Sequence, residues 1–177
     1  MHVKAAISSS NRRQWLSAAA CAAWTWPTLA RDAPTRPWPG GRTTPPLQLP
    51  AVDGTAWSLA AARGSPVLLN FWASWCEPCR AEMPSLQRLA AQHKAQGLQV
   101  MAINFREGEA AVRRFMTTTA LSLPVLYDRD GAAAKAFGVR TFPSTVAIDR
   151  RGQARFVVVG EVDWASPAVQ RWLAALL

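Results

Sequence analysis

Two cysteines in the middle of the chain carry the clearest chemistry of the sequence. Cys76 and Cys79 are separated by Glu77 and Pro78, and they follow an apolar run (66–74) that predicts a buried strand. A C-x-x-C between a strand and a helix is typical of a redox-active thiol pair. The first thiol then lies where free backbone N–H groups and the helix dipole favour a thiolate, and the second lies one turn along. The sequence therefore predicts a dithiol that exchanges electrons with disulfides.

Two other interpretations of this cysteine pair stay open. A zinc site usually needs about four ligands, and beyond residue 30 His93 is the one further histidine or cysteine. A purely structural disulfide would also suit an exported protein, although a loop this short adds little chain-entropy stabilisation. Both interpretations are therefore weaker than the redox pair.

The N-terminal residues differ in charge from the rest of the chain. The 177 residues hold 20 Lys+Arg against 11 Asp+Glu, a net charge of +9, and no acidic residue precedes Asp32. Arg12 and Arg13 are followed by a mildly apolar, alanine-rich stretch that ends in a small-x-small site at 28–30. This pattern is typical of a secretory signal of the twin-arginine (Tat) type. We expect a Tat-like signal peptide over 1–30 and a periplasmic protein, which stays membrane-anchored if the signal is not cleaved.

The next segment predicts a spacer before the folded domain. Residues 31–46 hold five prolines and two glycines without periodicity, which favours an extended, proline-rich linker. The remaining residues, 47–177, carry a net charge of +4 that is scattered along the sequence. Such a weak and dispersed charge argues against a nucleic-acid partner. We expect one domain over 47–177, working as a monomer.

Strand and helix patterns alternate through this domain, and its end predicts an antiparallel strand pair followed by a helix. Alternation predicts parallel strands with helical crossovers. Together with the antiparallel pair at the end, the order of elements predicts an α/β protein with a mixed sheet. An Asp53-Gly54 turn within 47–59 predicts an additional hairpin. Strands are expected at 66–74, 98–104, 124–128, 144–149 and 154–160, and helices at 77–96, 108–120, 130–138 and 164–177.

The segment FWASWCEPCRAEMP (71–84) closely resembles the active site of exported thioredoxin-like thiol–disulfide oxidoreductases of the TlpA/ResA type. The resemblance covers 47–177 and includes a TFPST segment (141–145) where that family has its cis-proline. It implies a thioredoxin-like fold, a central mixed β-sheet flanked by helices with an extra N-terminal β-hairpin. It also implies an enzyme in which Cys76 attacks a client disulfide and Cys79 resolves the mixed disulfide.

The same resemblance suggests which residues support the cysteines. Pro143 matches the cis-proline that faces the disulfide, and the backbone of Phe142 would pair with an extended client segment. Glu82 follows Cys79 by three residues and so shares its helix face. We expect Glu82 to move protons for the thiols, since Asn70 occupies the position of thioredoxin's buried aspartate and cannot do so.

Three residues beside the cysteines are expected to contact the client or to tune the pair. Trp75 is interpreted as part of an apolar docking rim. Pro78 stiffens the loop between the cysteines. The Glu77 carboxylate opposes the helix dipole and disfavours a thiolate at Cys76, which argues against a strongly oxidising pair. The expected function is therefore reduction of protein disulfides.

The resemblance also implies partners. The electron donor would be a membrane thiol reductase of the DsbD/CcdA kind, and clients would be apocytochrome c or proteins with copper sites. No cofactor is expected beyond the Cys76–Cys79 disulfide, and no metal. Two alternatives remain open. A peroxiredoxin-like peroxidase would need Thr/Ser-x-x-Cys with an arginine partner, but Ser74 is only two residues before Cys76. A copper chaperone would need C-x-x-x-C and a distant histidine. Here the spacing between the cysteines is one residue shorter, and no histidine follows His93.

Overall fold

The computed structural model describes residue 2 and residues 35–177. Apart from residue 2, the expected Tat-like signal over 1–30 lies outside the described residues and stays a prediction. Within the described part of the chain, no helix combines the length and the apolar character needed to cross a bilayer. The described residues 35–177 belong to one compact unit.

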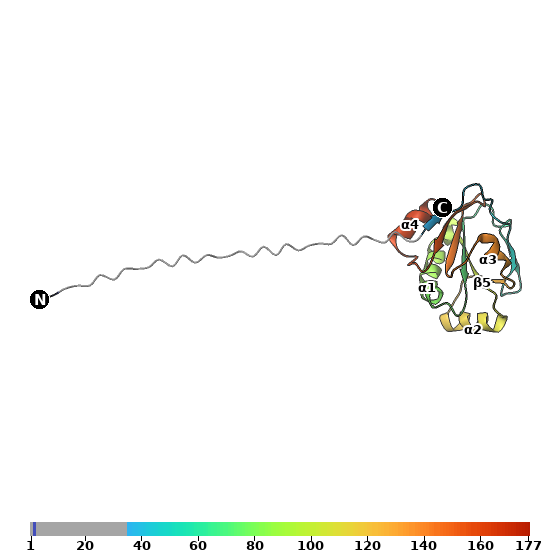
Figure 1. Cartoon of the computed structure of the whole chain (residues 1–177), viewed down its shortest axis with the longest axis horizontal. Coiled ribbons are helices and arrows are strands. Elements are labelled where there is room, and N and C mark those ends of the chain that lie inside the picture. The colour runs from blue at the N-terminus through green and yellow to red at the C-terminus, as the bar shows by residue number, and fades with distance from the viewer. Residues whose placement is uncertain (1, 3–34) are drawn as a thin grey trace. The chain divides into compact units, whose positions relative to one another are not determined.

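A six-stranded mixed sheet forms the centre of this unit (Figure 1). Its order is β1-β8-β7-β4-β5-β6, in which β4, β5 and β6 run parallel while β7, β8 and β1 pair antiparallel with their neighbours. The expected mixed sheet is thus confirmed. The strands are β1 (Thr35–Pro37), β4 (Val67–Trp72), β5 (Gln99–Phe105), β6 (Val125–Asp128), β7 (Ser144–Ile148) and β8 (Ala154–Val159).

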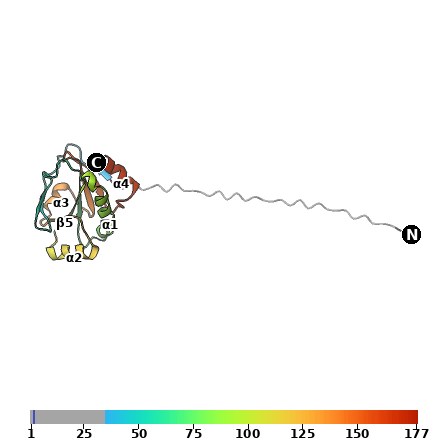
Figure 2. The same ribbon diagram turned by 180° about the vertical axis from the view of Figure 1, so that it is seen from behind.

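Helices cover both faces of the sheet, as Figure 1 and the reverse view in Figure 2 show. One apolar core joins the sheet to α1, α2 and α4, and a second core on the other face includes α3 and the residues around Leu47 and Leu59. The helices are α1 (Glu77–Gln92), α2 (Glu109–Thr119), α3 (Ala132–Phe137) and α4 (Pro167–Ala174), with a short 3₁₀ turn η1 (Lys94–Gln96) after α1.

Strand β4 is central because it is apolar on both faces. All six of its residues are buried, as expected for a strand with a helix layer on either side. Leu68 and Trp72 point into the core of α1, whereas Leu69 and Phe71 point into the core of α3. The strand therefore delivers the chain, at its carboxyl end, directly to the start of α1 and to the cysteine pair.

The expected hairpin is also present. Strands β2 (Gln48–Pro50) and β3 (Ala56–Ser58) pair antiparallel around the Asp53-Gly54 turn, and Gly54 has the positive φ of 86° that such a turn requires. The hairpin touches the main sheet through an antiparallel bridge between Ala51 and Leu126.

The described residues of the expected linker, 35–46, depart from an extended spacer. Thr35–Pro37 forms β1 at the sheet edge, paired with β8. An edge strand tolerates proline because half of its N–H groups face away from the sheet. The following Trp38 packs its ring 6.1 Å from that of Phe137, and Arg42 donates a hydrogen bond to the carbonyl of Ala136. The folded unit therefore includes residues 35–46 and does not begin at residue 47.

Candidate active site

The cysteine pair lies at the N-terminus of α1 and forms a disulfide with an S–S distance of 2.08 Å. Cys76 is the N-cap of the helix, and its sulfur accepts a hydrogen bond from the backbone N–H of Cys79 at 3.2 Å. Pro78 occupies the first turn, where its missing N–H costs nothing. Cys79 is fully buried and Cys76 is 5% exposed, so Cys76 is the sulfur nearer to solvent.

The expected cis peptide bond joins Phe142 to Pro143. Ser144, which follows, pairs with Phe71 across β7 and β4. Because Phe71 is five residues before Cys76, this register brings the Phe142–Pro143 bond to the carboxyl end of β4, beside the disulfide. The structure thus brings the TFPST segment and the C-x-x-C segment together.

Trp75 and Phe142 form an aromatic surface next to the disulfide. The Trp75 side chain is 67% exposed, the one large apolar side chain with such exposure among the described residues. Its ring lies edge-on to that of Phe142, with 5.9 Å between the centroids. An exposed tryptophan is the kind of group that protein interfaces use, so this placement agrees with a docking rim.

Glu82 is buried beneath the pair, with 2% of its surface exposed. Its Oε1 accepts a hydrogen bond from Asn70 Nδ2 at 2.7 Å, and its Oε2 accepts one from Trp164 Nε1 at 3.3 Å. The same Asn70 Nδ2 also donates to Thr145 Oγ1 at 2.9 Å. Burial outweighs these hydrogen bonds and raises the pKa of Glu82 from 4.5 to about 7. A carboxyl of this kind can accept or release a proton near neutral pH.

Glu77 has a different environment from Glu82. Its side chain is 84% exposed, and its carboxylate lies 3.6 Å from Arg80 Nε. Solvent and this ion pair both screen its charge. The effect of Glu77 on Cys76 is therefore weaker than the sequence alone suggests.

A second carboxylate at the site, that of Glu107, was not predicted from the sequence. Glu107 accepts hydrogen bonds from the N–H of Ser74 at 2.6 Å, from its Oγ at 2.5 Å, and from Asn104 Nδ2 at 2.7 Å. It thereby ties the loop before Cys76 to the end of β5. A signal was present, because Asn104 lies near the end of β5, the strand beside β4, and Glu107 follows its carboxyl end, where loops of α/β proteins carry function.

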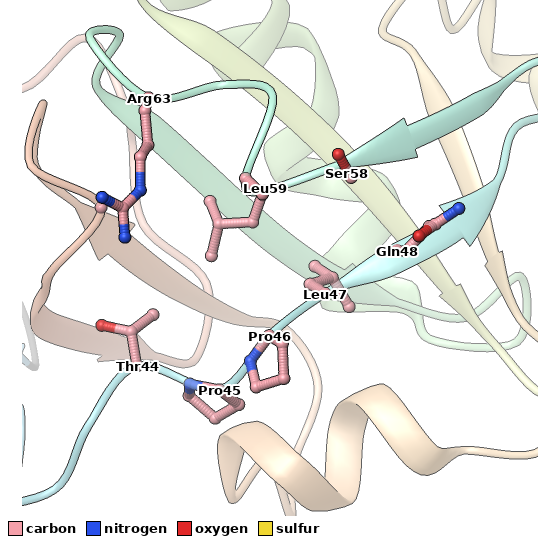
Figure 3. Close-up of a pocket in the computed structure, with 10 residues that line it drawn as sticks. Thr44, Pro45, Pro46, Leu47, Gln48, Ser58, Leu59 and Arg63 are labelled. Carbon is pink, nitrogen blue, oxygen red and sulfur yellow. The ribbon is translucent and has the colours of Figure 1, made fainter.

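A separate cavity of about 420 Å³ lies between residues 44–48, residues 58–63 and Gly152 of the β7–β8 turn (Figure 3). Thr44, Leu47, Leu59 and Arg63 are among the residues that line it. None of the predicted site residues lines this cavity. His93, the remaining candidate metal ligand, is buried and holds its Nδ1 against the side chain of Gln96.

Comparison with known proteins agrees with this geometry. The sequence pattern of the AhpC/TSA family matches residues 41–157. The chain belongs to this family. Among its relatives, Thiol-disulfide oxidoreductase ResA of Geobacillus thermodenitrificans is 34% identical over 120 residues, which are 68% of this chain and 69% of that protein. Thioredoxin-like protein YneN of Bacillus subtilis is 39% identical over 123 residues, 68% of this chain and 71% of YneN.

A solved structure extends the likeness to three dimensions. The secreted Mycobacterium tuberculosis disulfide oxidoreductase homologous to E. coli DsbE superposes with a TM-score of 0.61 at 27% identity, covering 73% of this chain and 96% of that one. Together these findings confirm the expected ResA-like family and thioredoxin-like α/β fold. This member of the AhpC/TSA family is an enzyme, a thiol–disulfide oxidoreductase.

Proposed function

We propose that this oxidoreductase is exported and reduces disulfides of other proteins through the Cys76–Cys79 dithiol. The observation that carries the proposal is the disulfide itself, at a helix N-terminus beside Phe142 and Pro143, with Cys79 fully buried and Cys76 5% exposed. Only the outer sulfur is placed to meet a macromolecule, so we assign Cys76 as the nucleophile and Cys79 as the resolving thiol.

The proposed reaction is a thiol–disulfide exchange in two steps. The Cys76 thiolate attacks one sulfur of a client disulfide, which forms a Cys76–client disulfide and releases one client thiolate. Cys79 loses its proton and attacks the Cys76 sulfur. This step forms the Cys76–Cys79 disulfide and releases the second client thiolate. Two electrons pass to the client, and a thiol reductant restores the dithiol.

Glu82 is proposed to accept the proton of Cys79 in the second step. The two side chains are three residues apart on one helix face, both are buried, and a carboxyl with a pKa of about 7 is well matched to the task. Asn70 and Trp164 hold the carboxyl in place by hydrogen bonds, and Asn70 also donates to the hydroxyl of Thr145.

The direction of electron flow is argued from the lack of thiolate stabilisation. Among the described residues, the hydrogen bond from the Cys79 N–H is the one such bond to the Cys76 sulfur. Glu77 adds a negative charge between the cysteines, although Arg80 offsets part of it. Strong oxidants need a very stable thiolate in the reduced form, whereas here Glu77 opposes the stabilisation that the helix N-terminus gives to a Cys76 thiolate. We therefore assign the protein as a reductant.

Location and partners follow from sequence and relatives. The twin arginines and the small-residue stretch over 1–30 support Tat-type export to the periplasm, and the Mycobacterium tuberculosis protein similar to this chain is described as secreted. We propose a membrane thiol reductase of the DsbD/CcdA kind as electron donor. Apocytochrome c and copper-site proteins are the proposed clients, since their cysteines must be reduced before they bind haem or metal.

Two measurements test the proposal. The reduction potential of the Cys76–Cys79 couple, equilibrated against glutathione, should lie well below about −150 mV; a value near that of the strong oxidants, about −120 mV, would overturn the assignment as a reductant. In addition, Cys79→Ser should trap a covalent complex with a disulfide-containing client, whereas Cys76→Ser should not. Trapping by Cys76→Ser alone would reverse the roles of the two cysteines.

A peroxidase is the second candidate, favoured by the match to the AhpC/TSA family. The residue three before Cys76 is Ala73, which offers no hydroxyl to a bound peroxide. Turnover of hydrogen peroxide by the reduced protein, at a rate exceeding its rate with protein disulfides, would make this the main activity.

A further inference from the structure

A row of three aromatic rings leads away from the disulfide and ends at an arginine. Trp75 contacts Phe142 as described, and the ring of Phe142 lies 4.9 Å from that of Phe105. The guanidinium carbon of Arg106 lies 5.8 Å from the centroid of Phe105. Trp75 and Arg106 are exposed, while Phe142 and Phe105 are half-buried. We call Trp75, Phe142, Phe105 and Arg106 the client row.

The backbone at Arg106 is held in an unusual conformation. Its φ is 57°, in the left-handed region that side chains with a Cβ rarely adopt. The backbone N–H of Arg106 donates to the carbonyl of Asp128 at 3.0 Å, which fixes this turn at the end of β5. Backbone outliers cluster at functional sites, and this one sets the direction of the arginine beside Phe105.

Gly131 leaves the room that the client row occupies. A Cβ at this position would lie 2.8 Å from Phe105 Cε2, closer than real contacts allow, and 3.0 Å from Arg106 Cδ, tighter than most real contacts. Arg106 thus has a strained backbone, and Gly131 lies opposite it. Both features allow the side chains of Phe105 and Arg106 to lie side by side.

The charge of Arg106 is available to a partner. Within residues 35–177, its side chain makes neither an ion pair nor a hydrogen bond. The neighbouring Glu107 is engaged by Ser74 and Asn104, and both carboxylate oxygens of Asp128 accept N–H groups at the start of α3. An exposed cation at the end of an apolar row is complementary to an acidic side chain that follows an apolar one.

We propose that the client row is a specificity site for an extended client segment that places an apolar residue on the rings and an acidic residue against Arg106. The inference rests on the proposed reduction of protein disulfides and names which clients are preferred. The occupant is a segment of another protein, since the row starts beside the reactive sulfur and a client bound at Cys76 necessarily brings its flanking residues there.

The test uses synthetic peptides with one cysteine, held as a mixed disulfide with a small coloured thiol, and the reduced full-length protein. Glutamate, glutamine or lysine is placed at successive positions on either side of the cysteine, and release of the coloured thiol is followed by stopped flow. At one position, glutamate should be reduced roughly two- to fivefold faster than glutamine, as expected for an exposed ion pair. Arg106→Glu should reverse the order and favour lysine there.

Two further variants keep the result interpretable. Arg106→Gly removes the charge while suiting the left-handed backbone, so it should fold and lose the preference. Arg151→Glu makes the same charge change in the exposed turn beyond the far end of β7 and should behave like the wild type. All variants should reduce a neutral dipyridyl disulfide within about twofold of the wild-type rate, because that reagent has no acidic group for Arg106 to bind.

The outcomes separate the two proposals. If no peptide disulfide is reduced, the proposed function fails. If peptides are reduced but Arg106→Glu shows the same charge dependence as the wild type, the client row is overturned while the function stands. A dimer in sedimentation that Arg106→Glu dissociates would assign the row to a second copy of this chain and would also overturn the proposal.

Discussion

Replacement of Glu82 by glutamine tests the raised pKa of the buried carboxyl. The quantity to measure is the free energy of unfolding as a function of pH. The pKa of Glu82 is raised from 4.5 to about 7 by burial. The folded protein therefore binds this proton more tightly than the unfolded chain does, and the stabilisation is complete below about pH 4.5. As pH rises from about 4.5 to about 7, the unfolded chain loses the proton first, so the free energy of unfolding falls.

The magnitude follows from the same values. At about 1.4 kcal/mol per pH unit, the whole difference corresponds to about 3 kcal/mol. About 2.5 kcal/mol of this lies between about pH 5 and about pH 8. Glutamine does not titrate, so Glu82→Gln should lack this decline and should be more stable than the wild type at about pH 8.

The surroundings can accept the amide. Glutamine would place one N–H group where Asn70 or Trp164 now donates. Asn70 can resolve this by turning its own amide over, because its Oδ1 is buried without a hydrogen-bond partner. The turned Oδ1 then accepts from Gln at position 82 and from the hydroxyl of Thr145. The Nδ2 group takes the buried place in which Oδ1 has no partner, and this offsets part of the gain in stability. The remaining oxygen at position 82 still accepts from Trp164.

Urea unfolding of the oxidised protein at about pH 5 and about pH 8 measures the effect. The quantity to compare is the difference between wild type and variant, because other groups titrate equally in both. Glu161→Gln is the matched control, since Glu161 is an exposed neighbour that raises the pKa of Glu82 only as a secondary cause. Parallel pH dependence of the wild type and Glu82→Gln would refute the raised pKa and the proton-transfer role built on it.

Three further perturbations have defined outcomes. Trp75→Ala should lower kcat/KM for a protein disulfide by roughly five- to tenfold while leaving a small neutral disulfide unaffected; equal losses for both would mean that Trp75 acts on the cysteines and not on docking. Glu107→Ala leaves the Ser74 N–H and the buried Asn104 amide unpaired and should cost about 2–3 kcal/mol in urea unfolding; the exposed Glu109→Ala control should cost under about 0.5 kcal/mol, and similar costs would contradict the role of Glu107. A chain that begins at residue 41 loses β1 and should be about 2 kcal/mol less stable than one that begins at residue 35; equal midpoints would show that β1 contributes nothing.

Local patterns predicted the parts of the site that are close in sequence. The apolar run before Cys76 and the C-x-x-C spacing were sufficient to place the disulfide at the junction of β4 and α1. The hairpin turn at Asp53-Gly54 was equally visible, because a glycine with positive φ leaves a clear signal. Residue pattern and spacing therefore predicted those features that depend on a single strand, helix or turn.

The residues that complete the site were not predictable in this way. The Glu82 carboxyl meets Asn70 and Trp164, which are 12 and 82 residues away along the chain. Contacts of this kind depend on the register of β4 and on the docking of the segment before α4, and neither is encoded in local periodicity. Strand β1 was missed for another reason, since Thr35–Pro37 has the composition of a linker and becomes a strand only through its pairing with β8.

The stretch from β1 to the hairpin has a consequence for association of the folded protein. The sheet ends at β1 on one side and at β6 on the other. A three-residue strand that contains Pro37 closes the first edge, and on the second edge Ala51 bridges Leu126 while the N–H of Val52 donates to Val125. Residues 35–52 thus cover both edges, which are the usual templates for strand-to-strand aggregation. A variant without these residues would keep Cys76, Cys79 and Glu82 but would expose the edge of β8. We therefore expect it to aggregate although its redox residues are intact.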